Sequence, residues 1–169
     1  MRLLFEMDKK DYAACTHSFT RNSARSIIIR DKNIAMIHSM KDDHYEFPGG
    51  GIETGETPEE AMVRETAEEA GLAVIPETIR EYGYVHRKQK SDWDETECFI
   101  QGNYYYLCEA ETSAAPQRLD GYEAEEGYTL EWVDPYTAIR RNRKSPYHPM
   151  VLEREARVLE LLITEGYFN

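Results

Sequence analysis

The chain has 169 residues, of which 41% are hydrophobic and 31% are charged, a composition typical of one folded domain and not of a disordered chain. A formal net charge of −12 argues against binding to duplex nucleic acid, because neutralising phosphates requires an excess of Lys and Arg. The sequence lacks a signal peptide and the roughly 20 apolar residues of a membrane span, and its three cysteines form no CxxC pair, so we expect a cytoplasmic protein with no membrane partner.

The first predicted elements form a β-hairpin over residues 25–40. Two apolar runs rich in β-branched residues flank Asp31-Lys32-Asn33, a tripeptide suited to a turn. Residues 48–51, Pro-Gly-Gly-Gly, interrupt regular structure, and a helix is predicted after them. Strands are then predicted near residues 79–87, 99–109 and 128–133.

The last part of the sequence predicts helices. Asp134-Pro135 resembles a helix start, and a final helix is predicted over about residues 150–165, before Gly166. Exposed loops are expected at residues 86–95 and 113–127. The intermixed strands and helices favour an α/β or α+β fold, with a mixed β-sheet between helices.

The helix over residues 57–71 has the best-defined ends. Thr57 as N-cap and Glu60 three residues later make a capping box, and Pro58 occupies the first helical position. Gly71 stands where a left-handed C-terminal cap belongs.

Three carboxylates, from Glu65, Glu68 and Glu69, fan across about 100° of one face of this helix. Arg64 precedes Glu68 by four residues, a spacing that allows an ion pair. The residues near the opposite pole, expected to meet the sheet, are Val63, Ala67 and Ala70. Neighbouring carboxylates repel one another, and Mg²⁺ removes this cost because it binds carboxylate oxygens. The alternative, an acidic face that is only solvated, leaves the glycine run, Glu56 and Arg64 unexplained.

The spacing of these residues resembles the Nudix box, the signature of the Nudix hydrolases. The box reads Gly-x5-Glu-x7-Arg-Glu-U-x-Glu-Glu-x-Gly-U, where U is bulky and aliphatic. Here it runs from Gly50 through Glu56 and Arg64 to Gly71-Leu72, with every charged and glycine position filled. The departure is Thr66 at the first U, where the hydroxyl should disturb packing slightly.

The resemblance implies a single Nudix hydrolase domain over residues 1–169, folded as an α/β/α sandwich. It implies a hydrolase that cleaves the pyrophosphate linkage of a small molecule, a nucleoside diphosphate linked to another moiety. Mg²⁺, with Mn²⁺ as a substitute, would be the cofactor. By position, the implied metal ligands are Glu65, Glu68, Glu69 and the Gly50 carbonyl. The residues implied to support the site are Glu56, Arg64, Gly51 and Gly71, and Arg64 is counted among the catalytic residues.

A general base is also required, and the family is not uniform in where it lies. Some members use a glutamate of the box, and others use an acid of a later loop. The late-loop candidates are Glu123, Glu125 and Glu126, and we select Glu125 among them.

Residues outside the box are expected to select the substrate. Tyr45 and Phe47 precede the glycine turn and are candidates to stack on a base, although each also suits the core. Arg25 is a candidate to bind an anion, and the basic segment at residues 86–90 offers further cations.

Two other functions remain open at this point. A non-catalytic Nudix-fold sensor or binding module would usually lose box glutamates, which this chain retains. A prenyl diphosphate isomerase would need a catalytic cysteine, for which Cys98 and Cys108 are candidates. Related hydrolases commonly form dimers, and the C-terminal helix or the tyrosine-rich strand offers a face for a homodimer.

Overall fold

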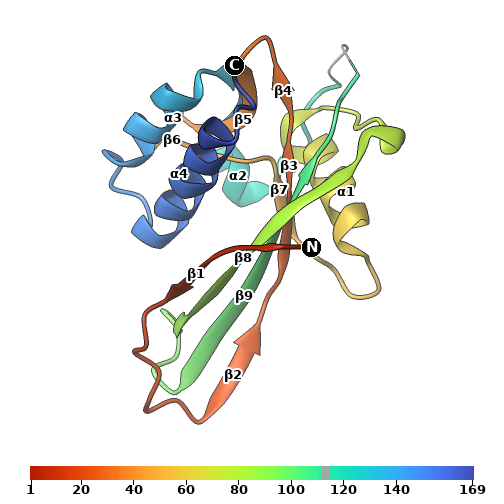
Figure 1. Cartoon of the computed structure of the whole chain (residues 1–169). Helices are drawn as coiled ribbons and strands as arrows, with labels where there is room; N and C mark the ends of the chain where they lie inside the picture. The colour runs from red at the N-terminus through yellow and green to blue at the C-terminus, as the bar shows by residue number, and fades with distance from the viewer. Residues whose placement is uncertain (112–114) are drawn as a thin grey trace.

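The computed structural model describes residues 1–111 and 115–169, which form two β-sheets flanked by helices (Figure 1). The larger sheet is mixed and has the strand order β1-β8-β9-β3-β7, with β2 paired to β9. Its strands are β1 (Leu3–Asp8), β2 (His17–Thr20), β3 (Ser23–Ile27), β7 (Gly49–Gly51), β8 (Arg80–Lys90) and β9 (Glu97–Leu107). The smaller sheet is antiparallel, with β10 and β6 both paired to β5. Its strands are β4 (Ile29–Arg30), β5 (Asn33–Ser39), β6 (His44–Glu46) and β10 (Tyr128–Val133).

Helices lie on both sides of the strands, and a hydrophobic core lies beneath each side. Figure 1 shows α1 (Pro58–Ala70) on one side, and α3 (Pro135–Asn142) with α4 (Pro149–Thr164) on the other. One core includes Tyr45, Phe47 and Leu159, whereas the other includes Met62 and Tyr106. The predicted α/β/α arrangement with a mixed sheet is therefore confirmed. No helix in the described ranges is long and apolar enough to cross a membrane.

The ends of α1 are set by its own sequence, as predicted. Thr57 accepts a hydrogen bond from the Glu60 amide at 3.2 Å, and Glu60 accepts one from the Thr57 amide at 2.8 Å. The helix ends at Gly71, whose φ of 65° is left-handed. A Cβ at Gly71 would lie 2.0 Å from the Ala115 carbonyl oxygen, so a side chain is excluded there on two grounds.

The buried face of α1 differs from the predicted one. The residues that α1 buries are Ala61, Met62, Thr66, Glu69 and Ala70, whereas Val63 and Ala67 are half-buried. The helix packs against β3 and β7, and the buried Glu69 side chain accepts a hydrogen bond from Gly49 of β7. The sheet-facing side is therefore rotated toward the carboxylates, which places one of them inside the molecule.

Several elements correct the sequence-based expectations. The expected loop at residues 86–95 is strand in its first half, because β8 continues to Lys90, and residues 91–95 form the loop. The expected hairpin over residues 25–40 is divided, since β3 joins the larger sheet and only β4 and β5 pair around Asp31-Lys32. The expected loop at residues 113–127 falls partly outside the described residues and contains the short helix α2 (Gly121–Glu126).

Candidate metal-binding active site

Three carboxylates from two helices converge at one point. Glu65 and Glu69 come from α1 and Glu123 from α2, and one oxygen of each lies within 4.8 Å of those of the other two. Glu69 is 7% exposed, and burial raises its pKa well above the ordinary value. Burial also raises the pKa of Glu123. Carboxylates crowded in this way are stabilised by a cation or by protons.

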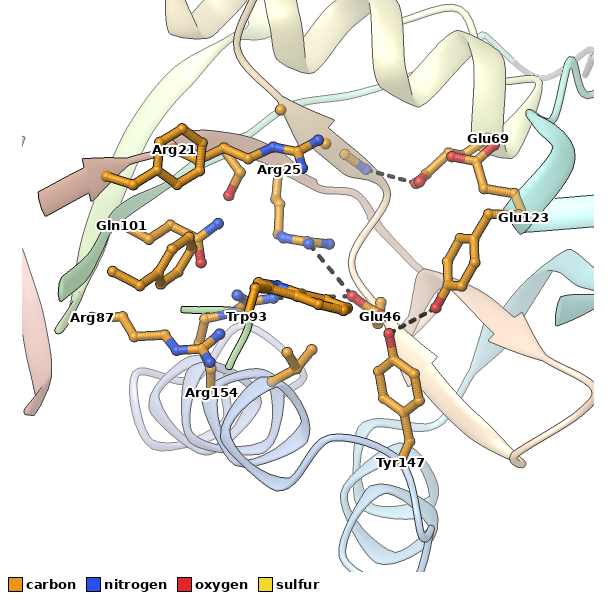
Figure 2. Close-up of a pocket in the computed structure, with 18 of the residues that line it drawn as sticks. Arg21, Arg25, Glu46, Glu69, Arg87, Trp93, Gln101, Glu123, Tyr147 and Arg154 are labelled. Atoms are coloured by element: carbon orange, nitrogen blue, oxygen red, sulfur yellow. Dashed lines mark hydrogen bonds and ion pairs between the residues drawn. The ribbon is translucent and has the colours of Figure 1, made fainter. Parts of the chain in front are cut away.

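The glycine segment forms the wall beside this cluster, and it is the short strand β7 paired with β3 instead of the expected interruption of regular structure. The Gly49 amide donates a hydrogen bond of 2.9 Å to Glu69, which fixes the carboxylate (Figure 2). At Gly50, a Cβ would lie 2.5 Å from the carboxyl carbon of Glu65. Glycine at this position therefore allows strand β7 to lie this close to the glutamates, because any larger residue would place its Cβ against Glu65.

Arg64 connects strand β7 to the carboxylate face of α1. Its guanidinium donates to Glu56 at 2.8 Å, to Glu65 at 2.7 Å and to the Gly51 carbonyl at 3.1 Å. The predicted ion pair with Glu68 is confirmed at 3.3 Å. The contact with Arg64 lowers the pKa of Glu56 to about 2, so Glu56 stays ionised. Arg64 therefore orients the carboxylates and offsets their repulsion.

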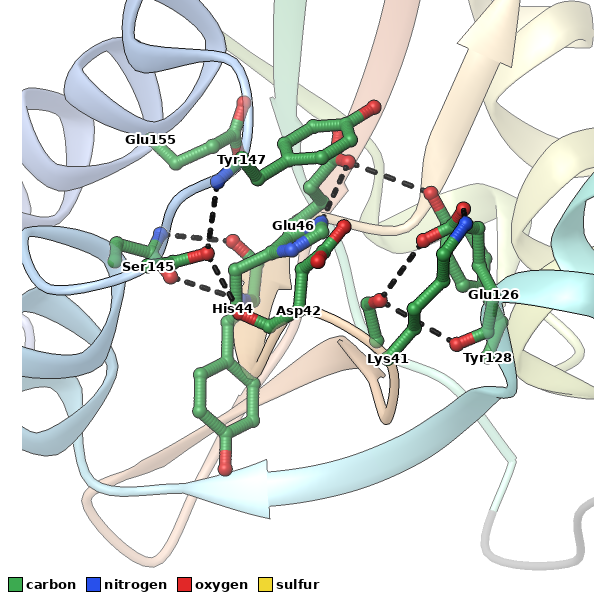
Figure 3. A network of polar contacts seen from close by, with 12 residues as sticks. Lys41, Asp42, His44, Glu46, Glu126, Tyr128, Ser145, Tyr147 and Glu155 are labelled. Atoms are coloured by element: carbon green, nitrogen blue, oxygen red, sulfur yellow. Dashed lines mark hydrogen bonds and ion pairs between the residues drawn. The ribbon is translucent and has the colours of Figure 1, made fainter.

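The three late-loop acids occupy different environments. Glu123 joins the cluster, while its carboxylate also accepts a hydrogen bond of 2.9 Å from the Asp120 amide. Glu126 is buried and binds Lys41 at 2.7 Å in the polar network of Figure 3. Glu125 is exposed and does not line the neighbouring cavity. The structure thus brings Glu123 to the site, in place of the expected Glu125.

The sequence contains a local signal for Glu123. Asp120 and Glu123 form a second capping box, which starts α2 and fixes the orientation of the Glu123 side chain. Pairing of α2 with α1 depends on residues far apart in the chain, so its place at the site could not be read from this motif alone.

Beside the cluster lies a cavity of about 530 Å³. Carboxylates lie at one end, with Glu69 and Glu123, and arginines lie toward the other, with Arg87 and Arg154 (Figure 2). Aromatic side chains line the walls and mouth, namely Phe19, Trp93, Phe99, Tyr122, Tyr128 and Tyr147. The cavity therefore offers separate surfaces for a cation, for anions and for flat apolar groups.

The structure places one of the predicted substrate-binding residues at the cavity and the other two in the core. Arg25 lines the cavity, 3.4 Å from Glu46. Tyr45 and Phe47 are 1% and 0% exposed, belong to the core and do not line the cavity. Their burial corrects the expectation that they stack on a base, since the aromatic side chains at the cavity come from β2, β9, β10, α2 and loops.

Residues 20–154 match the NUDIX domain family. The chain belongs to this family. It is therefore a Nudix hydrolase, and the Nudix box identified from the sequence is the segment that supplies Glu65 and Glu69.

Similar proteins agree with this assignment. The chain is 28% identical over 141 residues to an RNA pyrophosphohydrolase of Acinetobacter baylyi, covering 75% of this chain and 83% of the relative. It is 30% identical over 103 residues to an RNA pyrophosphohydrolase of Vibrio vulnificus, covering 57% of this chain but only 60% of the relative. A solved MutT structure, from Aliivibrio salmonicida or Vibrio cholerae, has a TM-score of 0.56 at 22% identity, covering 87% of this chain and 99% of the other. At that identity the structural likeness shows the Nudix fold alone.

The Nudix site has the donor set for a divalent cation. Hard cations such as Mg²⁺ take carboxylate oxygens, and three of these meet here from two helices. The Gly49 amide hydrogen bond and the Arg64 contacts hold two of the carboxylates in place. The residues present therefore fit the metal dependence typical of the family.

Neither cysteine proposed for isomerase chemistry faces the cavity. Cys98 and Cys108 are buried and do not line it, and burial raises the pKa of Cys108 to about 12. Neither is placed to act on a ligand bound beside the Nudix box.

Proposed function

We propose that this Nudix hydrolase cleaves the phosphoanhydride linkage of a nucleoside diphosphate attached to another moiety, with Mg²⁺ bound at the carboxylate cluster. The observation that carries the proposal is the convergence of Glu65, Glu69 and Glu123 at one end of a cavity whose other end is lined by arginines. A cation at the first end and guanidinium groups beyond it suit a ligand with several phosphate charges.

Each residue has a role that follows from its contacts. Glu65 and Glu69 would hold the metal. The Nudix box adds Glu68 and the Gly50 carbonyl by position, although the Glu68 side chain pairs with Arg64 and lies outside the three-carboxylate cluster. When bound, the metal neutralises phosphate oxygens and lowers the pKa of a bound water. Arg64 orients the carboxylates and does not touch the substrate.

We assign the general base to Glu123. It reaches the cluster from α2, so it can accept a proton from a water beside Glu69. Its second hydrogen bond, from the Asp120 amide, keeps the carboxylate oriented. Replacing Glu123 should therefore lower turnover more than it lowers metal affinity, whereas replacing Glu69 should lower both.

The aromatic residues at the mouth supply a surface for the base. Trp93 is 95% exposed yet lines the cavity, and Tyr122 and Tyr147 share a hydrogen bond of 2.9 Å across the opening. Flat apolar faces bind a nucleobase by stacking. Two relatives are named RNA pyrophosphohydrolases, which supports an RNA among the candidate substrates, although the net charge of −12 disfavours a long RNA.

The test is hydrolysis of a substrate panel by the wild type, Glu69→Gln and Glu123→Gln, with Mg²⁺, Mn²⁺ or EDTA. The panel contains nucleoside triphosphates, ADP-ribose, UDP-glucose, dinucleoside polyphosphates and a short 5′-triphosphorylated RNA. Glu59→Gln is the matched control, because Glu59 is an exposed glutamate of the same helix. Reaction in ¹⁸O-water then identifies the phosphorus atom that is attacked.

We expect metal-dependent turnover that falls at least about 100-fold in Glu69→Gln, since a metal contributes several kcal/mol to such a reaction. Glu59→Gln should match the wild type. If the folded wild type hydrolyses no compound with either metal but still binds nucleotides, the sensor function replaces the hydrolase. Equal loss of activity in Glu59→Gln and Glu69→Gln would remove the cluster from the mechanism.

A further inference from the structure

Arg87 is a buried cation without a carboxylate partner in the described part of the chain. Its side chain lies on β8, faces the cavity and is 6% exposed. Its Nε and one terminal nitrogen donate to the Gln89 amide oxygen at 3.1 and 3.0 Å, and the guanidinium lies 5.4 Å from the centre of the Phe99 ring. These partners are neutral, and Asp92, the carboxylate that offsets part of the positive charge, accepts a hydrogen bond from Gln89 and not from Arg87.

The other buried arginines of the cavity are paired. Arg25 lies 3.4 Å from Glu46, and Arg154 forms an ion pair with Glu155. Burial, together with repulsion by Arg154, lowers the pKa of Arg87 to about 10, so it remains charged near neutral pH. The cavity therefore holds one more buried positive charge than these two carboxylates neutralise.

Further hydrogen-bond donors face the same space. The Nε of Arg25 is buried and has no hydrogen-bond partner within the described residues, and the amide of Gln101 lines the cavity between Arg21 and Arg87. Figure 2 shows Arg87, Arg154 and Gln101 away from Glu69 and Glu123, with Arg25 and Trp93 between the two groups. We call the set Arg87, Arg154 and Gln101 the arginine end of the cavity.

An oxyanion is the ligand that suits this arrangement of donors. A buried guanidinium without a counter-charge is unfavourable, and phosphate or carboxylate compensates it with charge-assisted hydrogen bonds. The arginine end is separated from the carboxylate cluster, so one diphosphate held at the cluster would leave the far donors unpaired.

We propose that the arginine end binds a second anionic group of the substrate, a phosphate or carboxylate that lies outside the hydrolysed diphosphate. This inference rests on the proposed hydrolysis and adds the class of substrate. The preferred substrates are nucleoside diphosphate derivatives that carry a further acidic group, and the neutral derivatives are poorer.

The test uses two pairs of compounds that differ in one anionic group. UDP-glucuronic acid and UDP-glucose differ by a carboxylate, and 2′-phospho-ADP-ribose and ADP-ribose differ by a phosphate. For each pair, kcat/KM is measured with Mg²⁺, and binding to the metal-free protein is measured by isothermal titration calorimetry. The proteins are the wild type, Arg87→Gln, Arg87→Lys and Arg80→Gln, whose exposed arginine lies on the same strand outside the cavity.

We expect the wild type to prefer the more anionic member of at least one pair by tenfold or more in both measurements. The pair identifies whether a phosphate or a carboxylate is selected. Arg87→Gln should abolish the preference by weakening the more anionic member more than the neutral one. Arg87→Lys should retain part of the preference, and Arg80→Gln should retain all of it. Thermal unfolding checks that each variant is folded, and Gln101→Leu replaces Arg87→Gln if that protein does not fold.

The two proposals fail in different ways. Hydrolysis without any preference in the wild type, or an equal loss for both members in Arg87→Gln, overturns the arginine end and leaves the hydrolase intact. A binding preference lost in Arg87→Gln, with no hydrolysis of any compound, supports the arginine end and overturns the hydrolase. If no compound is hydrolysed and no compound is bound, both the arginine end and the hydrolase are overturned.

Discussion

Thr66 is the position where the sequence departs from the Nudix pattern, and its replacement by valine tests why. The Thr66 hydroxyl donates a hydrogen bond of 2.9 Å to the Ser26 hydroxyl, and both residues are 0% exposed. This contact joins α1 to β3 beside Glu65 and Glu69. The hydroxyl therefore has a partner, which corrects the expectation that it only disturbs packing.

The cost of Thr66→Val follows from the loss of this one contact. Valine has nearly the same shape, so no cavity forms, and the lost hydrogen bond between buried neutral groups is worth about 1 kcal/mol. The free energy of unfolding should therefore fall by about 1 kcal/mol, which lowers the Tm by roughly 2–4 °C for a protein of this size. In Ser26→Ala/Thr66→Val neither hydroxyl is left unpaired, so the double variant should be more stable than the sum of the single changes predicts.

Urea unfolding of the wild type, both single variants and the double variant measures the coupling, which we expect to be about 1 kcal/mol. Thr129→Val is the control, because Thr129 is exposed and should change stability by less than about 0.5 kcal/mol. Turnover should stay close to that of the wild type, since Thr66 faces β3 and not the cluster. A Thr66→Val protein as stable as the wild type, with no measurable coupling, would refute this reasoning.

Three further predictions concern the cavity. Glu123→Gln should lower kcat at least roughly 100-fold, while Glu125→Gln should leave kcat unchanged. Equal effects of these two substitutions in steady-state assays would contradict the placement of α2. Trp93→Ala should change the free energy of unfolding by less than about 0.5 kcal/mol, because the side chain is exposed. The same variant should bind nucleotides about fivefold more weakly, since stacking is worth about 1 kcal/mol or more per base. Unchanged binding by calorimetry would remove Trp93 from the site. Burial of Glu46 would raise its pKa, but His44, Arg25 and Arg154 lower it to about 2. The folded-state pKa lies below the ordinary value of 4.5, so this carboxylate stabilises the fold above about pH 4.5, and the stabilisation is lost as the pH falls toward the folded-state pKa. The stability difference between wild type and Glu46→Gln, measured by urea unfolding from pH 7 to 3.5, should shrink with falling pH, and a constant difference would refute it.

Local signals made α1 predictable and non-local packing determined the rest of the site. The Thr57 capping box and Gly71 fix the ends of α1 through contacts within a few residues, so the sequence alone placed the box carboxylates on a helix. The buried side of α1 depends on β3 and β7, which periodicity does not specify. For that reason the sequence did not predict that Glu69 is buried or that Glu123 of α2 lies beside it.

The basic segment at residues 86–90 is a second case in which packing between distant residues could not be predicted from the sequence. Its charge predicted an exposed loop, but in β8 alternate side chains point to opposite faces, so Arg87 and Gln89 are buried while His86 and Lys88 are not. Residues 86–90 are all polar, so their hydropathy does not show which side chains are buried. Charged side chains are usually exposed, which is why the segment resembled a loop.

The distribution of charge within the cavity constrains how a ligand can bind. The whole chain is acidic, with a net charge of −12, yet Arg21, Arg25, Arg87 and Arg154 all line this one cavity. Glu65, Glu69 and Glu123 repel a phosphate until a cation neutralises them, whereas Arg87 attracts an anion without any metal. Removing divalent cations should therefore abolish hydrolysis but leave the preference for a second anionic group, because the two ends of the cavity act on different parts of the ligand.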